Sequence, residues 1–449
     1  MSNREDGFLK LLSNGELQIK EKYPDMYETL IDEYHRQKNV LMMVASCSLV
    51  SPPVLACQGM IPVNITAEGY PDQRYHAGCT QIDKIENMAI VLAKQLFNAN
   101  YANVQPHSAT TANEIVMFSL LNANDVILGM DLSSGGHLSH GANVSYSGTY
   151  FNSIKYGLDK NFLIDLNQVE SLAKKYRPKL IICGTTAYSR CINFKAFREI
   201  ADRVGAYLLA DISHISGLVA TGLHESPINY AHITISCTHK QLFGPRGGII
   251  LSGKDSDMEI LIRGKKRTLS QQLQKSVFPF FQGAPAMNLI AAKAMAFKLA
   301  MESDFRSTMN DVVRNSKILA QYFVSKDFDV ISGGTDTHIV LLDLQNKGIN
   351  GQVAERALEQ CGIIVNKNMV PNSDRSSKIP AGIRIGTNIL AQRKFSKEDV
   401  IKCGQLIEMV LANIIIDSDN TGTVRSDVKH RVITSVRELC EKNPINEYL

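Results

Sequence analysis

The stretch Ile233-Thr-Ile-Ser-Cys-Thr-His-Lys240 and its continuation Gln241-Leu-Phe-Gly-Pro-Arg-Gly-Gly248 place one lysine directly after a short apolar run. A second apolar run, Ile249 to Leu251, follows at once. A lysine that is partly buried between two strands loses proton affinity, so its free amine can attack an aldehyde. A single lysine at the end of a strand is more often only solvated. A function for Lys240 therefore needs support from a second feature.

That second feature is the apolar run Tyr207-Leu-Leu-Ala-Asp211, which ends in a carboxylate upstream of Lys240. In open α/β sheets, ligands bind beyond the carboxyl ends of the strands, so Asp211 and Lys240 are expected to face one crevice. Pyridoxal phosphate needs this pair, because a lysine binds its aldehyde and a carboxylate lies against its pyridinium nitrogen. The two runs together predict a site for this cofactor.

The spacing of apolar residues predicts the arrangement of the elements. Residues up to about Val44 carry apolar side chains at helical spacing, such as Met26, Leu30 and Tyr34, and are expected to form a helical arm. Further on, short apolar runs alternate with helical patterns, which predicts βαβ units and a largely parallel sheet buried on both faces. These runs lie at 125–130, 180–183, 206–210, 232–236 and 248–251.

The C-terminal part has a mixed pattern. A helix over 286–301 is expected to lead into a smaller α/β domain. Its strands are expected at 338–344 and 363–366, and its helices at 351–361 and 397–414. We therefore predict an N-terminal helical arm (1–50), a large pyridoxal-phosphate-binding domain (51–285), and a linker helix with a C-terminal domain (286–449).

Composition limits the class of protein. The 449 residues are 44% hydrophobic and 20% charged, which indicates a folded chain with a large core and two or more domains. The formal net charge of +4 is small and dispersed, so a nucleic-acid partner is not expected. The one basic cluster, Arg263-Gly-Lys-Lys-Arg267, reads as a solvated loop, with an anion or RNA patch as the alternative.

Cysteine usage and the N-terminal segment indicate a compartment. The nine cysteines have neither the spacing of a disulfide framework nor that of zinc ligands, so no metal site is expected. Reduced thiols are typical of the cytosol. The polar N-terminal segment lacks the apolar core of a signal peptide, and no run reaches the roughly 18 apolar residues of a membrane span. A cytoplasmic protein without a membrane partner is predicted.

Several strings resemble one family. Thr238-His239-Lys240, followed by Gly244-Pro-Arg-Gly-Gly248, resembles the cofactor-lysine signature of serine hydroxymethyltransferases, which are aminotransferase-like pyridoxal-phosphate enzymes of fold type I. Other strings recur in the expected order: Ala67-Glu-Gly-Tyr-Pro71, Val104-Gln-Pro-His-Ser108, Gly135-Gly-His-Leu-Ser-His-Gly141, Asp211-Ile-Ser-His-Ile-Ser-Gly217, Ser332-Gly-Gly-Thr-Asp-Thr-His338 and Gly382-Ile-Arg-Ile-Gly-Thr387. The resemblance spans roughly residues 23–411. It implies a mostly parallel central sheet, a smaller C-terminal α/β domain, pyridoxal phosphate as cofactor and tetrahydrofolate as co-substrate.

The resemblance also implies roles for cofactor-binding residues. Asp211 would hold the pyridine nitrogen, His137 would stack on the ring, and Thr186 and His214 would lie near its phenolic oxygen. Ser108, Ala109 and Thr110 would bind the phosphate at a helix N-terminus. Gly283 and Ala284 would reach the phosphate of a partner subunit, which implies a homodimer or a dimer of dimers. The residues with implied catalytic roles are Lys240, Glu68, His137, His239 and Tyr75.

Amino-acid and folate sites are implied in the same way. Arg384 would be the bidentate fork for the substrate carboxylate, with Ser46 beside it. Glu68 would be the acid and base next to the substrate hydroxyl, and Thr66 and His76 would lie on the same side. Leu132, Gly136, Leu138, Tyr75 and Asn368 would line the folate site.

The chain departs from the family pattern near the substrate. Thr66 and His76 stand where the family carries tyrosines, Cys47 and Ser48 replace Glu and Asn, and Ala109 replaces a glycine. Phe280 and Phe281 replace two small residues, and the overpacking that two rings would cause near the phosphate loop has to be relieved elsewhere. These departures leave two alternatives to hydroxymethyl transfer. One is a folate-independent aldolase or transaldolase for a bulkier or α-substituted β-hydroxy amino acid, and the other is a weakly catalytic partner subunit that binds the cofactor.

Overall fold

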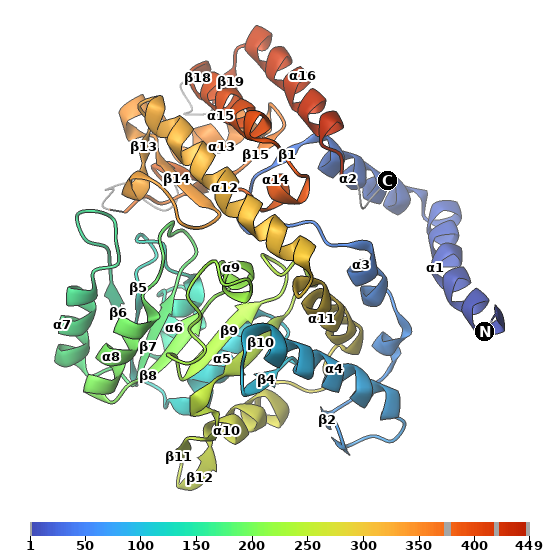
Figure 1. Cartoon of the computed structure of the whole chain (residues 1–449), viewed down its shortest axis with the longest axis vertical. Coiled ribbons are helices and arrows are strands. Elements are labelled where there is room, and N and C mark those ends of the chain that lie inside the picture. Colours follow the sequence, from blue (N-terminus) through green and yellow to red (C-terminus); the bar gives the residue numbers. More distant parts are fainter. Residues whose placement is uncertain (1, 372–378, 417–421, 446–449) are drawn as a thin grey trace.

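The computed structural model describes residues 2–371, 379–416 and 422–445. Figure 1 shows two lobes, with the N-terminal helix α1 (Ser2–Lys22) extending away from both. The larger lobe is built on a seven-stranded sheet and the smaller one on a four-stranded sheet. Within the described residues, no helix is both long enough and apolar enough to span a bilayer.

The seven-stranded sheet has the order β4-β10-β9-β8-β7-β5-β6. Its strands are β4 (Tyr101–Asn103), β5 (Val126–Met130), β6 (Asn152–Tyr156), β7 (Leu180–Gly184), β8 (Tyr207–Asp211), β9 (Ile233–Cys237) and β10 (Gly248–Ser252). The pairs from β9 to β6 are parallel, and β10 runs antiparallel to both of its neighbours. The predicted largely parallel sheet is confirmed.

Both faces of this sheet are buried. Successive side chains of a strand point in opposite directions, so alternate residues of one strand belong to the cores on the two faces. In β7, Ile181 and Cys183 belong to one hydrophobic cluster, whereas Leu180 and Ile182 belong to another. Helices α4 (Thr80–Phe97), α7 (Leu166–Tyr176), α8 (Phe194–Val204) and α11 (Met287–Ala300) pack in the first cluster. Helices α5 (Ala109–Leu120) and α10 (Leu269–Lys275) pack in the second. Strands that are covered on both sides need apolar side chains on both faces, which explains their continuous apolar runs.

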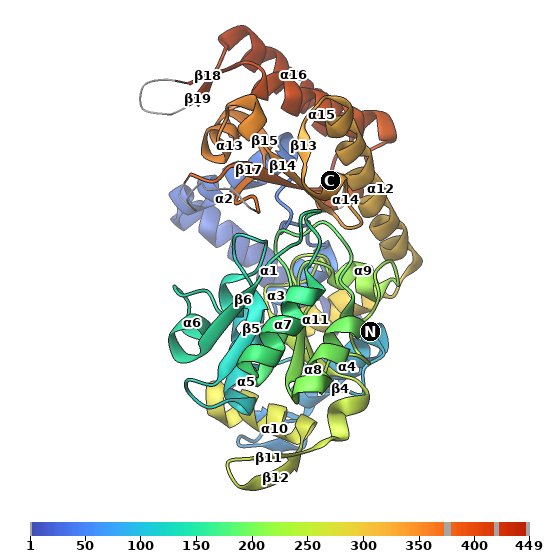
Figure 2. The same cartoon turned by 90° about the vertical axis from the view of Figure 1, so that its left-hand side faces the viewer.

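The smaller lobe contains an antiparallel sheet with the order β13-β14-β17-β16. Its strands are β13 (Asp329–Val330), β14 (Ile339–Asp343), β16 (Asn366–Asn368) and β17 (Gly382–Gly386), and its helices include α13 (Gly351–Glu359), α15 (Lys397–Leu411) and α16 (Ser426–Lys442). Helix α12 (Ser303–Ser325) runs from the larger lobe into the smaller one in both views (Figures 1 and 2).

Three local predictions are corrected. The helix predicted over 397–414 ends at Leu411, and Ile414–Ile416 form strand β18, because three β-branched residues in a row favour a strand. The run 363–366 is split between β15 (Ile363–Ile364) and β16. The basic cluster is not a loop but the tip of a hairpin formed by β11 (Glu259–Ile262) and β12 (Lys265–Thr268).

The N-terminal arm consists of α1 and α2 (Pro24–Asn39), and Pro24 opens the second helix at a position that needs no N–H group. After the arm, β1 (Leu41–Met42) pairs with β15 of the smaller lobe. Leu41 and Met43 are fully buried in the core of that lobe. The predicted divisions at residues 50 and 285 stay predictions, although the chain enters the core of the smaller lobe before residue 50.

Candidate active site

Lys240 and Asp211 lie at the same edge of the large sheet. Asp211 is the last residue of β8, which pairs in parallel with β9, and Lys240 follows β9 by a short turn. Thr238 holds this turn, since its Oγ1 donates to Pro245 O (2.6 Å) and its N–H donates to Gly247 O (3.1 Å). The sequence thus places the amine and the carboxylate at neighbouring strand ends, as expected for one crevice.

Asp211 is a buried and strongly stabilised anion. Burial alone would raise its pKa, but the hydrogen bond with His140 and the fields of His140 and His137 hold the pKa well below its usual range. Its Oδ2 lies 2.9 Å from His140 Nε2 and accepts from Asn113 Nδ2 (3.0 Å), while Oδ1 accepts from the Ser213 N–H (3.0 Å). A permanent negative charge of this kind stabilises a protonated pyridine nitrogen.

His137 and His140 lie in the same string but make different contacts. His137 Nδ1 accepts from the Ser139 N–H and lies 2.7 Å from Ser139 Oγ. Burial, together with the nearby His140, lowers the pKa of His137 to about 4, so its ring is neutral at physiological pH. A neutral ring suits stacking. The contact to Asp211 comes from His140, which our prediction left out although it lies in the same Gly135–Gly141 string.

The predicted phosphate residues form the start of α5. Ser108 is the N-cap, and its Oγ accepts from the Thr111 N–H (3.0 Å). The N–H groups of Ala109 and Thr110 have no acceptor among the described residues, as is usual for the first turn of a helix. Gly248 packs against this cap so closely that a Cβ there would lie 2.3 Å from Ser108 O. This open first turn is suited to an anion.

Gln282 connects the phosphate loop to the next segment. Its Oε1 accepts from the His107 N–H (3.1 Å), and its Nε2 donates to Gln105 O (3.0 Å). Gly283 and Ala284 follow directly and are therefore attached to the same loop that leads to Ser108. The added volume of Phe280 and Phe281 is accommodated on the outer side of this loop. Phe281 packs on Phe118 of α5, and Phe280 is 55% exposed.

Arg384 is buried on β17 and is held from two sides. Its Nε donates to Asn366 Oδ1 (2.9 Å) and its Nη1 donates to Thr186 O (2.7 Å). Within the described residues, Nη2 has no hydrogen-bond partner. Burial lowers the pKa of Arg384 to about 10, so the group stays charged at neutral pH. Thr186 Oγ1 is buried and has no hydrogen-bond partner among the described residues, so it can bond to a ligand oxygen.

His214 and His338 form a buried pair next to Lys240. Their rings are stacked with centroids 5.6 Å apart, and His338 Nε2 lies 3.1 Å from Ala45 O. Burial lowers the pKa of His338 to about 3 and that of His214 well below its usual range. Both rings are therefore neutral. His338 was not predicted as a site residue, although it closes the quoted string Ser332–His338.

Other predicted residues lie around this group. His239 is half-buried, and burial followed by the charge of Arg246 lowers its pKa to about 4. Ser46 is half-buried beside Ala45. The predicted folate residues are spread over two segments: Leu132, Gly136 and Leu138 lie in the loop that carries His137, and Asn368 lies on β16, next to the strand of Arg384.

Glu68 belongs to a separate group. Its Oε2 lies 3.2 Å from His76 Nε2, and its Oε1 is 3.4 Å from where a Cβ on Gly283 would be. Tyr75 is 73% exposed and packs edge-on against Phe278. Thr66 is also exposed. Among the described residues, no hydrogen bond or ion pair joins Glu68 to the lysine cluster, by which we mean Lys240, Asp211, His137, His214 and Arg384.

A buried arginine holds the loop around Glu68. Arg74 Nη1 donates to Ala67 O and Gly69 O (2.9 Å each), and its Nη2 pairs with Glu86 (2.5 Å). Gln105 Nε2 donates to Gly69 O (2.9 Å) and to Glu86 (2.8 Å), which connects this loop to the phosphate loop.

Replacing Arg74 with methionine is expected to lower the free energy of unfolding by about 3–5 kcal/mol, because Glu86 becomes an unpaired buried charge. Urea unfolding followed by circular dichroism measures this loss. The double variant Arg74→Met/Glu86→Met should recover part of it. As a control, Arg36→Met breaks an exposed pair with Glu33 and should cost less than about 1 kcal/mol. A loss below about 1 kcal/mol for Arg74→Met would contradict the role of this network.

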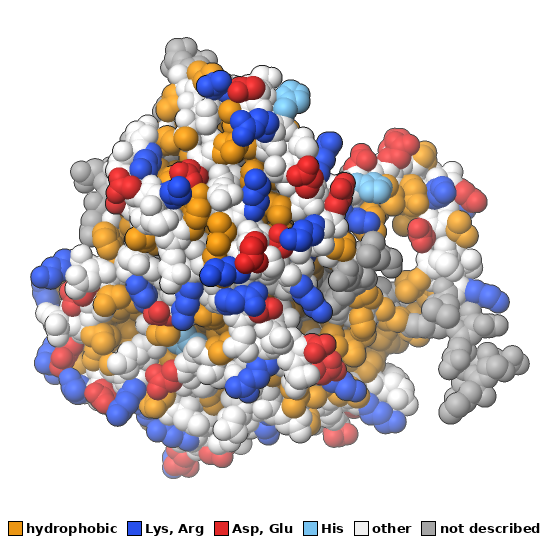
Figure 3. All heavy atoms as spheres, turned by 45° about the horizontal axis from the view of Figure 1, so that its top comes forward, with side chains coloured by type: hydrophobic (Ala, Val, Ile, Leu, Met, Phe, Trp, Pro, Cys, Tyr) orange, Lys and Arg blue, Asp and Glu red, His pale blue; other side chains and the backbone are white. Residues whose placement is uncertain are grey.

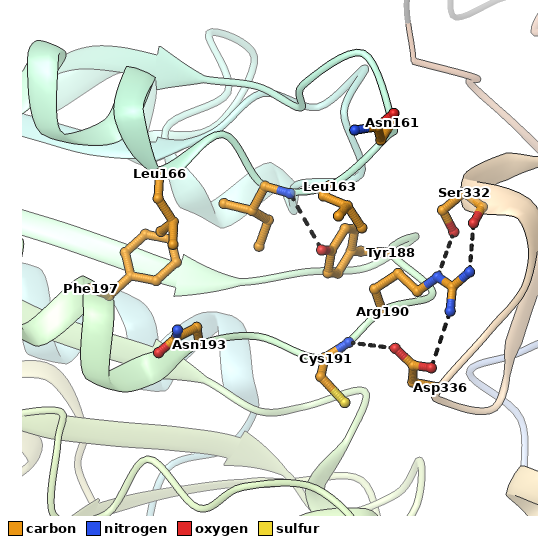
Figure 4. A pocket seen from close by; sticks show the side chains of 11 residues that line it. Asn161, Leu163, Leu166, Tyr188, Arg190, Cys191, Asn193, Phe197, Ser332 and Asp336 are labelled. Atoms are coloured by element: carbon orange, nitrogen blue, oxygen red, sulfur yellow. Dashed lines mark hydrogen bonds and ion pairs between the residues drawn. The ribbon is translucent and has the colours of Figure 1, made fainter.

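The lobes meet beside the site. Arg190 donates to Ser332 Oγ (3.0 Å) and Ser332 O (2.5 Å) and pairs with Asp336 (3.2 Å), as Figure 4 shows. These residues line a pocket of about 460 Å³ that also contains Tyr188 and Cys191. Because Thr186 lies in the same segment as Arg190, this contact fixes the loop that supports Arg384.

The fold and the lysine cluster define a class: a pyridoxal-phosphate-dependent enzyme of fold type I. Comparison with known proteins gives the family. The sequence model described as serine hydroxymethyltransferase matches residues 19–407. The chain is 45% identical to a serine hydroxymethyltransferase of Rickettsia canadensis (strain McKiel) over 427 residues, which cover 95% of this chain and 98% of the relative. It is also 45% identical to that of Orientia tsutsugamushi (strain Ikeda) over 432 residues, covering 94% and 99%. The chain therefore belongs to the serine hydroxymethyltransferase family, whose members use pyridoxal phosphate and tetrahydrofolate.

Proposed function

We propose that this chain transfers a hydroxymethyl group between serine and tetrahydrofolate, forming or consuming glycine. The observation that carries this proposal is the placement of Lys240 and the buried anion Asp211 at neighbouring strand ends, with the charges of both Lys240 and Arg384 close to His137 and His214. Asp211 has the charge that a protonated pyridine nitrogen needs, and Thr186 Oγ1 is a buried hydroxyl with no hydrogen-bond partner within the described ranges. The residues present therefore fit pyridoxal phosphate, which supplies an electron sink for cleavage at the amino-acid Cα when it is bound.

Each residue of the lysine cluster has a distinct task in this reaction. Lys240 would hold the cofactor through its amine. Arg384 would bind the substrate carboxylate, since its Nε and Nη1 are anchored and Nη2 has no hydrogen-bond partner within the described residues. His137, whose ring is neutral and half-buried, would pack on the cofactor. The buried pair of His214 and His338 presents neutral side chains, so it adds no competing charge next to Lys240.

Glu68 would move the proton of the substrate hydroxyl. In one chain it lies with His76 and Gly283, and among the described residues no hydrogen bond or ion pair joins it to the lysine cluster. Gly283 and Ala284 are the residues that the resemblance directs to a partner's phosphate. We therefore propose a homodimer in which Glu68 of one subunit completes the site of the other.

Mixing two inactive variants tests this shared site. Lys240→Ala and Glu68→Gln each inactivate their own homodimer. In a mixed dimer, one of the two sites carries both native residues, so random mixing should restore about a quarter of the native sites. Subunits are exchanged by mild denaturation and refolding, and serine turnover is measured. If the mixture stays inactive while mixed dimers are present by mass spectrometry, Glu68 acts within its own chain.

Turnover of serine with and without tetrahydrofolate tests the function itself. Glycine formation should depend on the folate, because tetrahydrofolate captures the one-carbon unit that would otherwise have to leave as free formaldehyde. Equal rates without folate would favour an aldolase. No response of the bound cofactor's absorbance to any amino acid would favour a weakly catalytic subunit. No finding here favours either alternative.

Two further proposals concern the cellular location of the protein and its partners. We propose a cytoplasmic enzyme, because all nine cysteines are free. Nucleic acid is not proposed as a partner, and Figure 3 shows acidic and basic side chains interspersed over the visible face. Within the described ranges, no group of histidine, cysteine, aspartate and glutamate side chains is suited to a metal ion.

A further inference from the structure

Lys293 on α11 is a buried lysine that forms no ion pair with a carboxylate in the part of the chain that the structure describes. The residue is only 2% exposed. Its Nζ donates to three backbone carbonyls, those of Val104 (2.6 Å), Pro106 (3.0 Å) and Gly248 (2.9 Å). Burying an ammonium group is costly unless its hydrogen bonds are satisfied. Here all three N–H groups find acceptors, so the side chain has one fixed position.

The three carbonyls belong to the two segments that frame the cofactor site. Val104 and Pro106 follow β4 and lead to Ser108, the cap of α5. Gly248 opens β10, directly after the turn that contains Lys240. The Gly248 N–H also donates to Pro106 O (2.9 Å). Lys293 therefore ties the phosphate loop to the end of the Lys240 turn.

Two glycines make room for this arrangement. A Cβ on Gly247 would lie 2.3 Å from Lys293 Cε and 2.9 Å from its Nζ. A Cβ on Gly248 would lie 2.3 Å from Ser108 O. The Gly247–Gly248 pair thus allows the ammonium on one side and the helix cap on the other to approach the same strand end. Any side chain at Gly247 would displace Lys293.

We infer that Lys293 is a positioning residue for the cofactor phosphate, which sets the place of Ser108–Thr110 relative to Lys240 and adds positive charge behind the first turn of α5. This inference rests on the proposed function, because it takes pyridoxal phosphate as the ligand. Burial lowers the pKa of Lys293 to about 7, with the charge of Glu86 acting in the opposite direction. The three carbonyl acceptors favour the protonated form, because only an ammonium group has a proton for each of them.

A packing role alone predicts a different result from a positioning role. Loss of packing would weaken the binding of every ligand of the site to the same extent. Loss of phosphate positioning should weaken the binding only of ligands that carry the phosphate. Pyridoxal has the same ring and aldehyde as pyridoxal phosphate but lacks the phosphate, so the ratio of the two dissociation constants separates the roles.

The experiment measures both dissociation constants by absorbance titration of the cofactor-free protein. For Lys293→Met, the constant for pyridoxal phosphate should rise about tenfold or more, whereas that for pyridoxal should change less than about threefold. Inorganic phosphate should raise the melting temperature of the wild type and not that of the variant. Lys298→Met, an exposed lysine on the same helix, is the matched control and should behave as the wild type.

The outcomes distinguish a failure of the proposed function from a failure of the inference on Lys293. If the wild type binds neither aldehyde, the proposed function fails. If the wild type binds both and Lys293→Met leaves their ratio unchanged, only the inference on Lys293 is overturned. Should Lys293→Met not fold, Gly247→Ala keeps the charge but displaces it, and the same selective loss is expected. An unchanged ratio in Gly247→Ala would then overturn the inference.

Discussion

Replacing Lys240 with alanine is expected to lower serine turnover by about 10⁴-fold or more, because the residue that holds the cofactor and hands it to the substrate is removed. The fold should be preserved, since Lys240 is only half-buried and its turn is held by Thr238. Treating the wild type with borohydride in the presence of pyridoxal phosphate should attach the cofactor to the peptide that contains Lys240. The variant should retain cofactor only without a covalent bond.

Two controls make this result specific. Lys254→Ala removes an exposed lysine near the end of the sheet's last strand and should leave both turnover and attachment unchanged. Circular dichroism should show the same helix content in both variants. A borohydride-stable adduct that persists in Lys240→Ala would place the attachment on another lysine, and the assignment would be wrong.

Arg384→Ala is expected to weaken binding of the amino acid by about 2–5 kcal/mol, the loss of one partner of a desolvated charge pair. In affinity this is about 30- to 5,000-fold. The effect should be large because Asn366 and Thr186 already hold the guanidinium group in place, so little ordering is needed when a carboxylate binds. Titration of the cofactor's absorbance with serine and glycine gives the dissociation constants.

Arg384→Lys is the matched variant. It keeps the positive charge but not the planar fork, so binding should fall between that of the wild type and that of Arg384→Ala. Amines that lack a carboxylate should bind all three proteins equally. If serine binds Arg384→Ala as tightly as the wild type, another residue holds the substrate carboxylate.

Much of the fold was predictable because it depends on local patterns. Five of the seven strands of the large sheet are apolar runs of about the right length, whereas β4 and β6 are too polar to be predicted in this way. Asp211 ends one of these runs, and Lys240 follows another by a short turn. The hairpin of β11 and β12 was not predictable in this way. Its second strand is mostly basic, so it lacks the alternation of a half-buried strand. Its two-residue turn has positive φ at both Arg263 and Gly264, as favoured hairpin turns do, but an arginine stands where asparagine or aspartate usually signals such a turn.

Contacts between distant segments were the part of the site that patterns did not predict. Lys293 and the pair of Arg74 and Glu86 look like ordinary surface charges in the sequence. Only the folded chain shows that they are buried against carbonyls or against each other. The residues next to Glu68 were predictable only in part, since spacing along a chain does not tell which residues meet. The family resemblance named Glu68 and put His76 on the same side, but it did not indicate that Gly283 lies next to Glu68.

Cys191, at the contact between the lobes shown in Figure 4, has a practical consequence. All nine cysteines lie in the described ranges, and Cys191 alone among them is exposed. Its N–H donates to Asp336 of the smaller lobe (3.3 Å), so this residue lies at the contact between the two lobes. Burial of the sulfur and the charge of Asp336 raise its pKa, so labelling at neutral pH will be slow and will benefit from mildly alkaline buffer. A fluorophore attached there would report on the surroundings of this contact without any engineered cysteine.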